Sequence, residues 1–408
     1  MKKCLRPVMW WRVRQLRSKR PDTRQRAARK LGEARCPGAV SGLVETLSDP
    51  EWTVRLAAIV ALTNIGDTRP YDQVLGLTKD DDWHVRKAAV AAVTVLGGLR
   101  AVGPLMSALS DRVPAVRQAA ALALGIIRDR RAVQPLIETM RDKSSDVRWD
   151  AAEALGLIGD ARATAALIAA LDDEDAKVTV KAADALARIG ARRAVTPLLA
   201  MLAEQRYRSV WFAAARALGA LKDARAFEPL LKLFQEEDLF SCDGDAVAEA
   251  LGQIGDSRAV TPLVAELANT RSFARAGAAK ALGLLGDARA IEPLMALFRE
   301  RGTSTAVHEA VVKALGAIGD PRPVSLLLRD LKSGWYAALA AQSLTAILRR
   351  SAAQIDPESL RRLARVKSVR VKQPGFLGLK TIRYRVDCSE LSRLARQELQ
   401  MRMKHLGG

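Results

Sequence analysis

The chain has 408 residues, a formal net charge of +20 and only 4% aromatic residues. No apolar run approaches the ~20 residues of a membrane span, and the basic N-terminus lacks the apolar core and cleavage site of a signal peptide. The four cysteines lie far apart, so neither a zinc knuckle nor a disulfide framework is indicated, and we expect reduced thiols in a cytoplasmic protein.

Positive charge gathers at the two ends of the chain. Residues 1–30 hold twelve Lys or Arg and one acid, and residues 349–408 hold fifteen Lys or Arg and five acids. The sequence between these ends is close to neutral. A protein that gripped nucleic acid along its whole length would carry the charge throughout, so this distribution argues against such a grip.

Residues 1–32 are predicted to form two basic capping helices, PVMWWRVRQLR and PDTRQRAARKLG. Terminal repeats need a polar outer face, which the arginines provide. The alternative is a basic amphipathic helix on an anionic surface, with Trp10 and Trp11 in a lipid headgroup layer. In that alternative, Arg12, Arg14 and Arg17 are candidate anion-binding residues.

Residues 33–350 repeat one pattern. Clear copies of its central segment read IGDARATAAL, IGDSRAVTPL and LGDARAIEPL, and most copies stand 31 to 33 residues apart. A fixed period in this range is the signature of a solenoid. The anchors are Gly32, Gly66, Gly97, Arg128, Gly159, Gly190, Lys222, Gly255, Gly286 and Gly319.

Each period contains two helical patterns. In the second, Val147, Ala151 and Leu155 share one apolar stripe. Glycine after this helix suits a left-handed cap, and the recurrent proline suits the first turn of the next helix. One helix pair cannot bury its own stripe, whereas stacked pairs can. We therefore predict an all-α, right-handed α-solenoid of about ten helix pairs.

The wording ALGxIGDxRAVxPL resembles the HEAT-like repeat of the phycocyanobilin-lyase type, from Ser18 to Leu348. The resemblance implies an armadillo-type superhelix in which an Asp and an Arg, six residues apart, form a ladder between neighbouring repeats. A carboxylate in the turn and a guanidinium opening the second helix can exchange charge-assisted hydrogen bonds. We therefore interpret these arginines as structural, not as a phosphate-binding stripe. The ladder residues are Asp49, Arg55, Asp80, Arg86, Asp111, Arg117, Asp142 and Arg148.

The repeats near residues 205–252 depart from this rule. Trp211 and Gly244 replace the ladder arginine, and the repeats lengthen to 32 and 33 residues. Insertions in solenoids map to one edge, and Tyr, Trp and Arg are common interface anchors. The alternative is that the aromatic residues fill the core between repeats. The candidate protein-binding residues are Arg206, Tyr207, Arg208, Trp211, Phe212 and Phe240.

His308 and Glu309 resemble the His-Glu motif of deoxyhypusine hydroxylase, a HEAT-repeat enzyme that builds a di-iron centre from four such pairs. Equivalent positions here hold other residues, such as Arg55-Leu56, and one pair cannot hold two irons. We expect His308 to replace a ladder arginine, and we predict neither a metal site nor a catalytic residue. The sequence also lacks a P-loop, a dinucleotide fingerprint and a nucleophile elbow.

Residues 351–408 are predicted to form a helix, a β-hairpin and a last helix. In TIRYRVDC, Ile382, Tyr384 and Val386 alternate with charged residues, which indicates a strand with one Arg-rich face. This appendage is either a cap docked on the last repeat or a small anion-binding module. The candidate anion-binding residues are Lys367, Arg370, Lys372, Arg383 and Arg385.

The predicted function is a non-catalytic scaffold that binds another protein on its concave or edge surface, without a cofactor or a small-molecule substrate. One alternative is binding of nucleic acid or an anionic membrane surface through the basic termini. A further alternative, implied by the lyase resemblance, is a subunit of a chromophore lyase.

Overall fold

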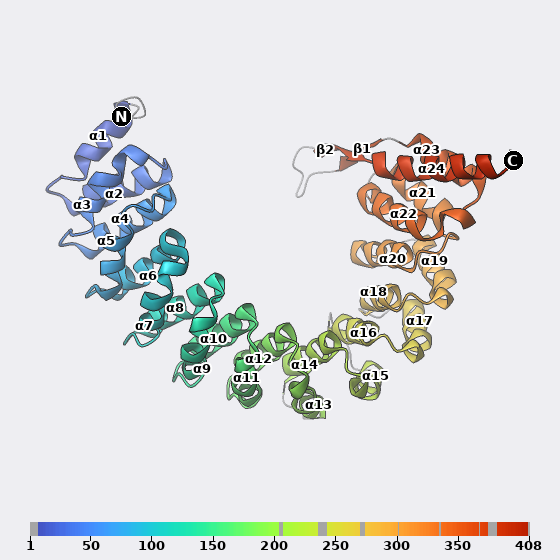
Figure 1. The fold of residues 1–408 in the computed structure, drawn as a ribbon, viewed down its shortest axis with the longest axis horizontal. Coiled ribbons are helices and arrows are strands. Elements are labelled where there is room, and N and C mark those ends of the chain that lie inside the picture. Colours follow the sequence, from blue (N-terminus) through green and yellow to red (C-terminus); the bar gives the residue numbers. More distant parts are fainter. Residues whose placement is uncertain are drawn as a thin grey trace. The chain divides into compact units, whose positions relative to one another are not determined.

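The computed structural model describes residues 7–203, 207–235, 243–269, 274–300, 302–333, 336–366, 368–373 and 382–406 (Figure 1). The chain divides into two compact units, Met1–Pro197 and Leu198–Gly408. Each unit is a stack of helix pairs, as the apolar periodicity predicts, because a pair buries its apolar stripe only against its neighbours. The prediction of an all-α solenoid with a C-terminal β-hairpin is confirmed.

In the first unit, each pair consists of a short first helix and a longer second helix. The second helices pack on one another, and each first helix packs on the second helix that follows it. The first helices are α1 (Pro7–Gln15), α3 (Val40–Thr46), α5 (Tyr71–Gly76), α7 (Val102–Ala108), α9 (Val133–Thr139) and α11 (Thr164–Ala169). The second helices are α2 (Pro21–Glu33), α4 (Trp52–Ile65), α6 (Trp83–Gly97), α8 (Pro114–Ile127), α10 (Ser145–Ile158) and α12 (Ala176–Ile189).

The boundary between the units falls within α13 (Val195–Ala203), and the same arrangement recurs in the second unit. Its later first helices are α15 (Phe227–Gln235), α17 (Val260–Ala268), α19 (Ile291–Arg299) and α21 (Val324–Ser333). Its second helices are α14 (Arg208–Leu221), α16 (Asp243–Ile254), α18 (Arg275–Leu285), α20 (Thr305–Ile318) and α22 (Ala337–Ser351).

The aspartate and arginine of the GDxR segment shape the turn that joins a second helix to the first helix of the next repeat. Asp160 accepts hydrogen bonds from the backbone N–H of Arg162, at 3.0 Å, and from its guanidinium. The aspartate thereby caps a short 3₁₀ turn that leads into the first helix. The 3₁₀ turns at this position after α8, α10 and α12 are η4 (Arg130–Ala132), η5 (Ala161–Ala163) and η7 (Arg192–Ala194), of which η7 has Ala191 in place of the aspartate.

A glycine inside the second helix lets neighbouring second helices approach closely. A Cβ placed on Gly125 of α8 would lie 2.7 Å from the Cα of Ala154 in α10, so only glycine fits without a shift. The equivalent positions of α4 and α6 hold Thr63 and Thr94. The pairs α4–α6 and α6–α8 accordingly pack less closely than α8–α10.

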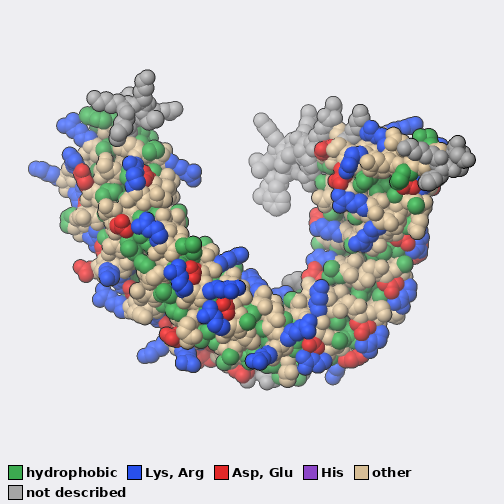
Figure 2. Space-filling model, in the orientation of Figure 1, with side chains coloured by type: hydrophobic (Ala, Val, Ile, Leu, Met, Phe, Trp, Pro, Cys, Tyr) green, Lys and Arg blue, Asp and Glu red, His purple; other side chains and the backbone are tan. Residues whose placement is uncertain are grey.

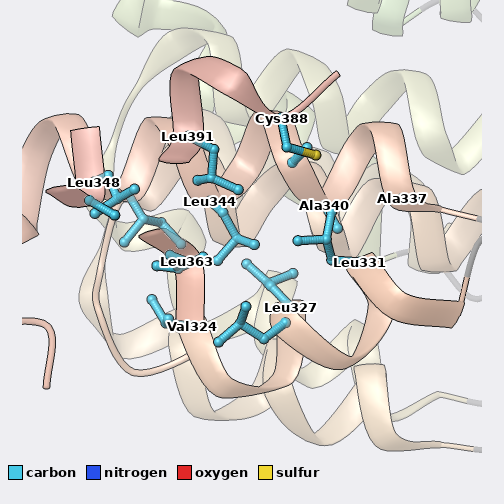
Figure 3. Close-up of a cluster of buried hydrophobic side chains, with 14 of the residues drawn as sticks. Val324, Leu327, Leu331, Ala337, Ala340, Leu344, Leu348, Leu363, Cys388 and Leu391 are labelled. Carbon is cyan, nitrogen blue, oxygen red and sulfur yellow. The ribbon is translucent and has the colours of Figure 1, made fainter. Parts of the chain in front are cut away.

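The C-terminal segment completes the core of the last repeat (Figure 3). Cys388 and Leu391 are buried against residues of α22 such as Leu344. The hydroxyl of Ser392, itself fully buried, donates to the carbonyl of Ala364 at 2.6 Å. The elements of this segment are α23 (Pro357–Arg365), β1 (Ser368–Gln373), β2 (Ile382–Asp387) and α24 (Ser389–Leu406).

Within the described residues, one stretch is long and apolar enough to cross a membrane by length and composition alone, Trp83–Ala108. It combines α6 and α7, which are separated by a turn at Gly98 with a φ of 51°. The expectation that no apolar run approaches the length of a membrane span is therefore wrong, because Trp83–Ala108 meets the test of length and composition. Val85, Val90 and Leu105 of this stretch are buried in the repeat core.

Candidate functional site

The ladder residues join each repeat to the next. Arg55 donates to both carboxylate oxygens of Asp80 at 2.8 Å, and its third nitrogen donates to the backbone carbonyl of Asp49 at 2.8 Å. Within one repeat, the arginine therefore binds the backbone carbonyl of the aspartate. The carboxylate that it binds belongs to the aspartate of the next repeat, 25 residues after the arginine. The carboxylate pairs are Arg24–Asp49, Arg55–Asp80, Arg86–Asp111, Arg117–Asp142 and Arg148–Asp173.

Burial and ion pairing both act on the ladder carboxylates. Burial alone would raise the pKa of Asp111, but hydrogen bonds from Arg86 and from the backbone N–H of Val113 hold it below its ordinary value. The side chain of Arg86 is only 5% exposed. The ladder arginines are thus committed to neighbouring repeats, which leaves little of their surface for a phosphate ligand.

Three successive repeats lack the ladder arginine. Beside Trp211 and Gly244, Thr179 occupies the equivalent position of α12, and its hydroxyl lies 3.4 Å from the carbonyl of Asp173. Thr179 was not among the predicted departures from the ladder, although its place 31 residues after Arg148 is the signal that identifies it.

The ladder position is charged again in α18 and α20. Arg275 pairs with Glu300, with Nη1 at 3.2 Å from Oε1. The Nε2 atom of His308 lies 2.9 Å from Asp330, and its ring packs against Phe298 and Tyr336. His308 therefore occupies the place of a ladder arginine. No group of three or more His, Cys, Asp or Glu is positioned to hold a metal ion in the described part of the chain.

The residues of the aromatic candidate site differ in exposure. Tyr207 is 61% exposed and Arg208 is exposed, whereas Trp211 is half-buried. Phe212 is only 5% exposed and belongs to the core of α14, so its assignment to a contact surface is wrong. Arg206 and Phe240 lie outside the described residues.

Of the N-terminal basic residues, Arg12 and Arg14 lie on α1 and Arg17 lies in the turn after it. Arg17 pairs with Glu45 at 2.9 Å, and Arg14 lies 6.0 Å from the ring centre of Trp10. Arg12 is partly exposed. Along the repeats, by contrast, Lys and Arg side chains are mixed with Asp and Glu over the visible face (Figure 2).

The backbone of the C-terminal hairpin brings its basic residues together. In the antiparallel register, Arg370 lies opposite Arg385 and Lys372 lies opposite Arg383. The charge alternation in the sequence predicted this grouping. Lys367 lies outside the described residues.

An exposed apolar stripe, which was not predicted from the sequence, runs across three second helices of the first unit. Val95 of α6 and Ile126 of α8 occupy equivalent positions 31 residues apart and are 64% and 62% exposed. Val60 of α4 and Leu122 of α8 lie one turn earlier and are 45% and 43% exposed. We call Val60, Val95, Leu122 and Ile126 the second-helix stripe. The sequence feature that indicates the stripe is an apolar residue, Val95 or Ile126, at a repeat position that elsewhere holds a polar residue such as Asn64, Arg188 or Gln253.

Polar groups border the stripe on both sides. Toward α2, a groove of about 240 Å³ is lined by Leu56 and Val60 together with Arg26 and Arg29. Toward α10, Glu153 binds Arg188 at 2.8 Å and Lys181 at 2.5 Å. Burial raises the pKa of the neighbouring Asp150, which accepts a hydrogen bond from Gln118 at 3.1 Å. The four most exposed apolar side chains of this surface therefore lie on α4, α6 and α8, and Leu157 at the equivalent position of α10 is only partly exposed.

The solved structure of importin beta agrees with this architecture. The chain is similar to importin beta in a crystal from an ammonium sulfate condition, with a TM-score of 0.62, 15% identity, and coverage of 96% of this chain and 62% of that chain. It also matches YibA of Escherichia coli with a TM-score of 0.49 and 20% identity, covering 62% of this chain and 93% of that one. An engineered protein matches with a TM-score of 0.41 and 20% identity over 97% of this chain and 98% of its own.

No curated protein matches the sequence. The family model of HEAT repeats matches residues 11–94, 74–156, 102–183, 135–211, 164–243, 244–305 and 274–348. These segments cover most of the chain and coincide with the helix pairs described above. The protein therefore belongs to the HEAT-repeat family.

Proposed function

We propose that this protein is a binding scaffold and that the second-helix stripe docks an apolar segment of another protein. The observation that carries the proposal is the exposure of Val95 and Ile126 at equivalent positions of adjacent helices. Contiguous exposed apolar surface on a water-exposed protein marks an interaction site more often than scattered single residues do.

The surroundings of the stripe suggest what the segment looks like. Thr63 and Thr94 keep α4, α6 and α8 from the close approach seen at Gly125, which leaves room for side chains between these helices. Arg26 and Arg29 line the groove beside Val60. An apolar segment with an acidic residue at one end would complement both features.

The test compares two variants at the same repeat position. Ile126→Glu places a charge in the stripe, while Leu284→Glu does so in α18 of the second unit, where the native side chain is 57% exposed. Proteins retained by the full-length chain from nuclease-treated extract are identified, and their affinities are then measured with purified components. Ile126→Glu should weaken binding at least about ten-fold, because a buried charge at an interface centre is costly.

Leu284→Glu should leave the affinity unchanged, and both variants should keep the helical circular dichroism of the wild type. A partner that binds Ile126→Glu as tightly as the wild type would overturn the assignment of the stripe. Loss with both variants would point to a general defect instead of a site.

We propose Tyr207, Arg208 and Trp211 as a second contact surface of the same scaffold. The 61% exposure of Tyr207 supports this assignment, since large exposed aromatic side chains are common anchors. Tyr207→Ala should weaken binding of a partner that uses this surface, while Phe212→Leu should affect stability. A partner unaffected by Tyr207→Ala would exclude this surface for that partner.

The C-terminal hairpin favours a second function, the binding of an anionic surface or nucleic acid. In the backbone register, Arg370 lies opposite Arg385 and Lys372 lies opposite Arg383, which groups four basic residues on two paired strands. A group of basic residues raises the local concentration of anionic ligands. Because α24 completes the core of the last repeat, substitutions test this function better than truncation.

Replacement of these four residues by Gln should abolish binding of anionic vesicles or of a labelled oligonucleotide, and wild-type affinity should fall steeply with salt. Salt-independent binding, or full binding by the variant, would exclude the hairpin as the site. The Arg12, Arg14 and Arg17 triple Gln variant tests the N-terminus in the same way.

Membership of the phycocyanobilin-lyase type of HEAT repeat stays an inference from the repeat wording. The contacts of Asp160 and Arg162 give that wording a structural reason, since the pair shapes a turn. The wording therefore supports the fold and carries no chemistry by itself. Pigment that copurifies with the native protein would support a lyase subunit, and colourless protein that still binds its partner would count against it.

A further inference from the structure

Three successive turns of the first unit carry exposed arginines along one edge. They join α8 to α9, α10 to α11 and α12 to α13. Neighbouring turns touch, since a guanidinium nitrogen of Arg162 donates to the backbone carbonyl of Arg130 at 3.0 Å. We call this surface the arginine edge, and it consists of Arg128, Arg130, Arg131, Arg162, Arg192 and Arg193, all exposed.

The carboxylates within these turns neutralise only part of the charge. Asp129 binds Arg131 at 2.8 Å, and Asp160 binds Arg162 at 2.9 Å. In the turn that follows, Ala191 takes the place of the aspartate beside Arg193. Six guanidinium groups thus face two carboxylates in the three turns.

Arg128 stands where most repeats use glycine, and Lys222 occupies the same position in the second unit with a φ of 53°. The φ of Arg128 is 58°, in the left-handed region, and the equivalent Gly159 and Gly190 have φ values of 73° and 74°. A side chain in this conformation is strained, and such strain concentrates at functional positions. The chain therefore keeps a basic side chain on this edge at a cost in stability.

The second unit shows which ligand the arginine of this turn accepts. Arg258 donates to Glu228 of the preceding repeat at 2.6 Å, and Arg322 lies 3.4 Å from Glu292 in the same way. In the first unit, the positions equivalent to Glu228 hold uncharged residues. Gln134 stands in the repeat before Arg162, and Ala165 stands in the repeat before Arg193. Arg162 and Arg193 of the arginine edge therefore have no glutamate at the position from which Glu228 binds Arg258.

We infer that the arginine edge binds an acidic segment of a partner protein, whose carboxylates take the places that Glu228 and Glu292 fill in the second unit. This inference deepens the proposed function and rests on it in taking the occupant to be a protein. All six basic groups are guanidinium groups, which bind carboxylates in pairs of hydrogen bonds. The three turns contain no aromatic residue on which the bases of a single-stranded nucleic acid would stack.

The experiment measures binding of a fluorescein-labelled decaglutamate peptide to the full-length protein by anisotropy. The edge variant combines Arg128→Gly, Arg192→Gln and Arg193→Gln, which leaves every ladder pair and both Asp–Arg turns intact. The Kd should rise about ten-fold, since three exposed ion pairs together contribute about one factor of ten. A charge-matched control with Gln at residues 12, 14 and 17 should change the Kd less than about three-fold.

Equal loss in the control, or unchanged binding by the edge variant, would overturn the inference. An oligodeoxythymidylate of the same length that competes with the peptide and binds the edge more tightly would also overturn it, in favour of nucleic acid. The Val95→Asn variant, which alters the second-helix stripe without adding charge beside Arg128, should bind the peptide like the wild type. Failure of the second-helix stripe and failure of the arginine edge are therefore distinguishable.

Discussion

Arg86 and Asp111 lie in neighbouring repeats, and two nitrogens of the guanidinium donate to the two carboxylate oxygens at 2.7 and 2.9 Å. The third nitrogen donates to the carbonyls of Asp80 and Asp81, both at 2.9 Å. One side chain therefore closes its own turn and binds the next repeat. In a solenoid, where each repeat contacts only its neighbours, such a contact couples the repeats directly.

Removal of Arg86 should be costly. Arg86→Ala leaves a nearly buried carboxylate and two carbonyls without their donor, and we expect a loss of about 3 kcal/mol in the free energy of unfolding. The matched control is Arg69→Ala, because Arg69 pairs with Asp67 but its side chain is 75% exposed. That change should cost less than about 1 kcal/mol. Urea denaturation followed by circular dichroism gives both values, and equal costs would contradict a coupling role for Arg86.

Addition of one methyl group at Gly125 should destabilise the stack. Its Cβ would lie 2.7 Å from the Cα of Ala154, and overpacking of this kind costs about 1–3 kcal/mol. Gly103 of α7 has no atom within 4 Å of such a Cβ. Gly103→Ala should therefore be neutral or stabilising by up to about 1 kcal/mol. The two melting temperatures check this contrast, and a Gly125→Ala variant as stable as the wild type would rule out the close approach.

The conformation of Arg128 predicts a stabilising substitution. Arg128→Gly removes a strained left-handed residue and should raise the free energy of unfolding by about 0.5–1 kcal/mol. The reciprocal change, Gly159→Arg, should destabilise by about 1 kcal/mol, because it creates the same strain in the next turn. Urea unfolding of both variants measures the two changes in the free energy of unfolding. A loss of stability in Arg128→Gly would show that Arg128 makes a compensating contact.

Acid should weaken the turns of the GDxR segment. The hydrogen bond from Arg162 lowers the pKa of Asp160 from the ordinary 3.8 to about 2. Because the folded pKa is the lower one, this group stabilises the fold above the unfolded value, and the contribution is lost as the pH falls through about 2. Asp160→Asn should be less stable than the wild type at pH 7, and the gap should narrow in acid. A constant gap between pH 7 and pH 2 would contradict the linkage.

The helix pairs, the turns and the interior followed from the sequence alone. The signals are local and recur from repeat to repeat: periodic apolar residues, a glycine after most second helices, and the Asp–Arg spacing. The grouping of Arg370 with Arg385 was also accessible, because alternation in a strand places such residues by rule.

Other features depended on which residues meet in space. The burial of Phe212, the partner of Arg55 in the following repeat and the role of Gly125 against Ala154 are contacts between helices, and no single repeat encodes them. The second-helix stripe and the arginine edge likewise arise because stacking aligns residues about 31 positions apart, such as Val95 with Ile126. The sequence determined what each repeat is, while the packing of repeat upon repeat decided which side chains remain exposed together, since only tertiary contacts remove surface from water.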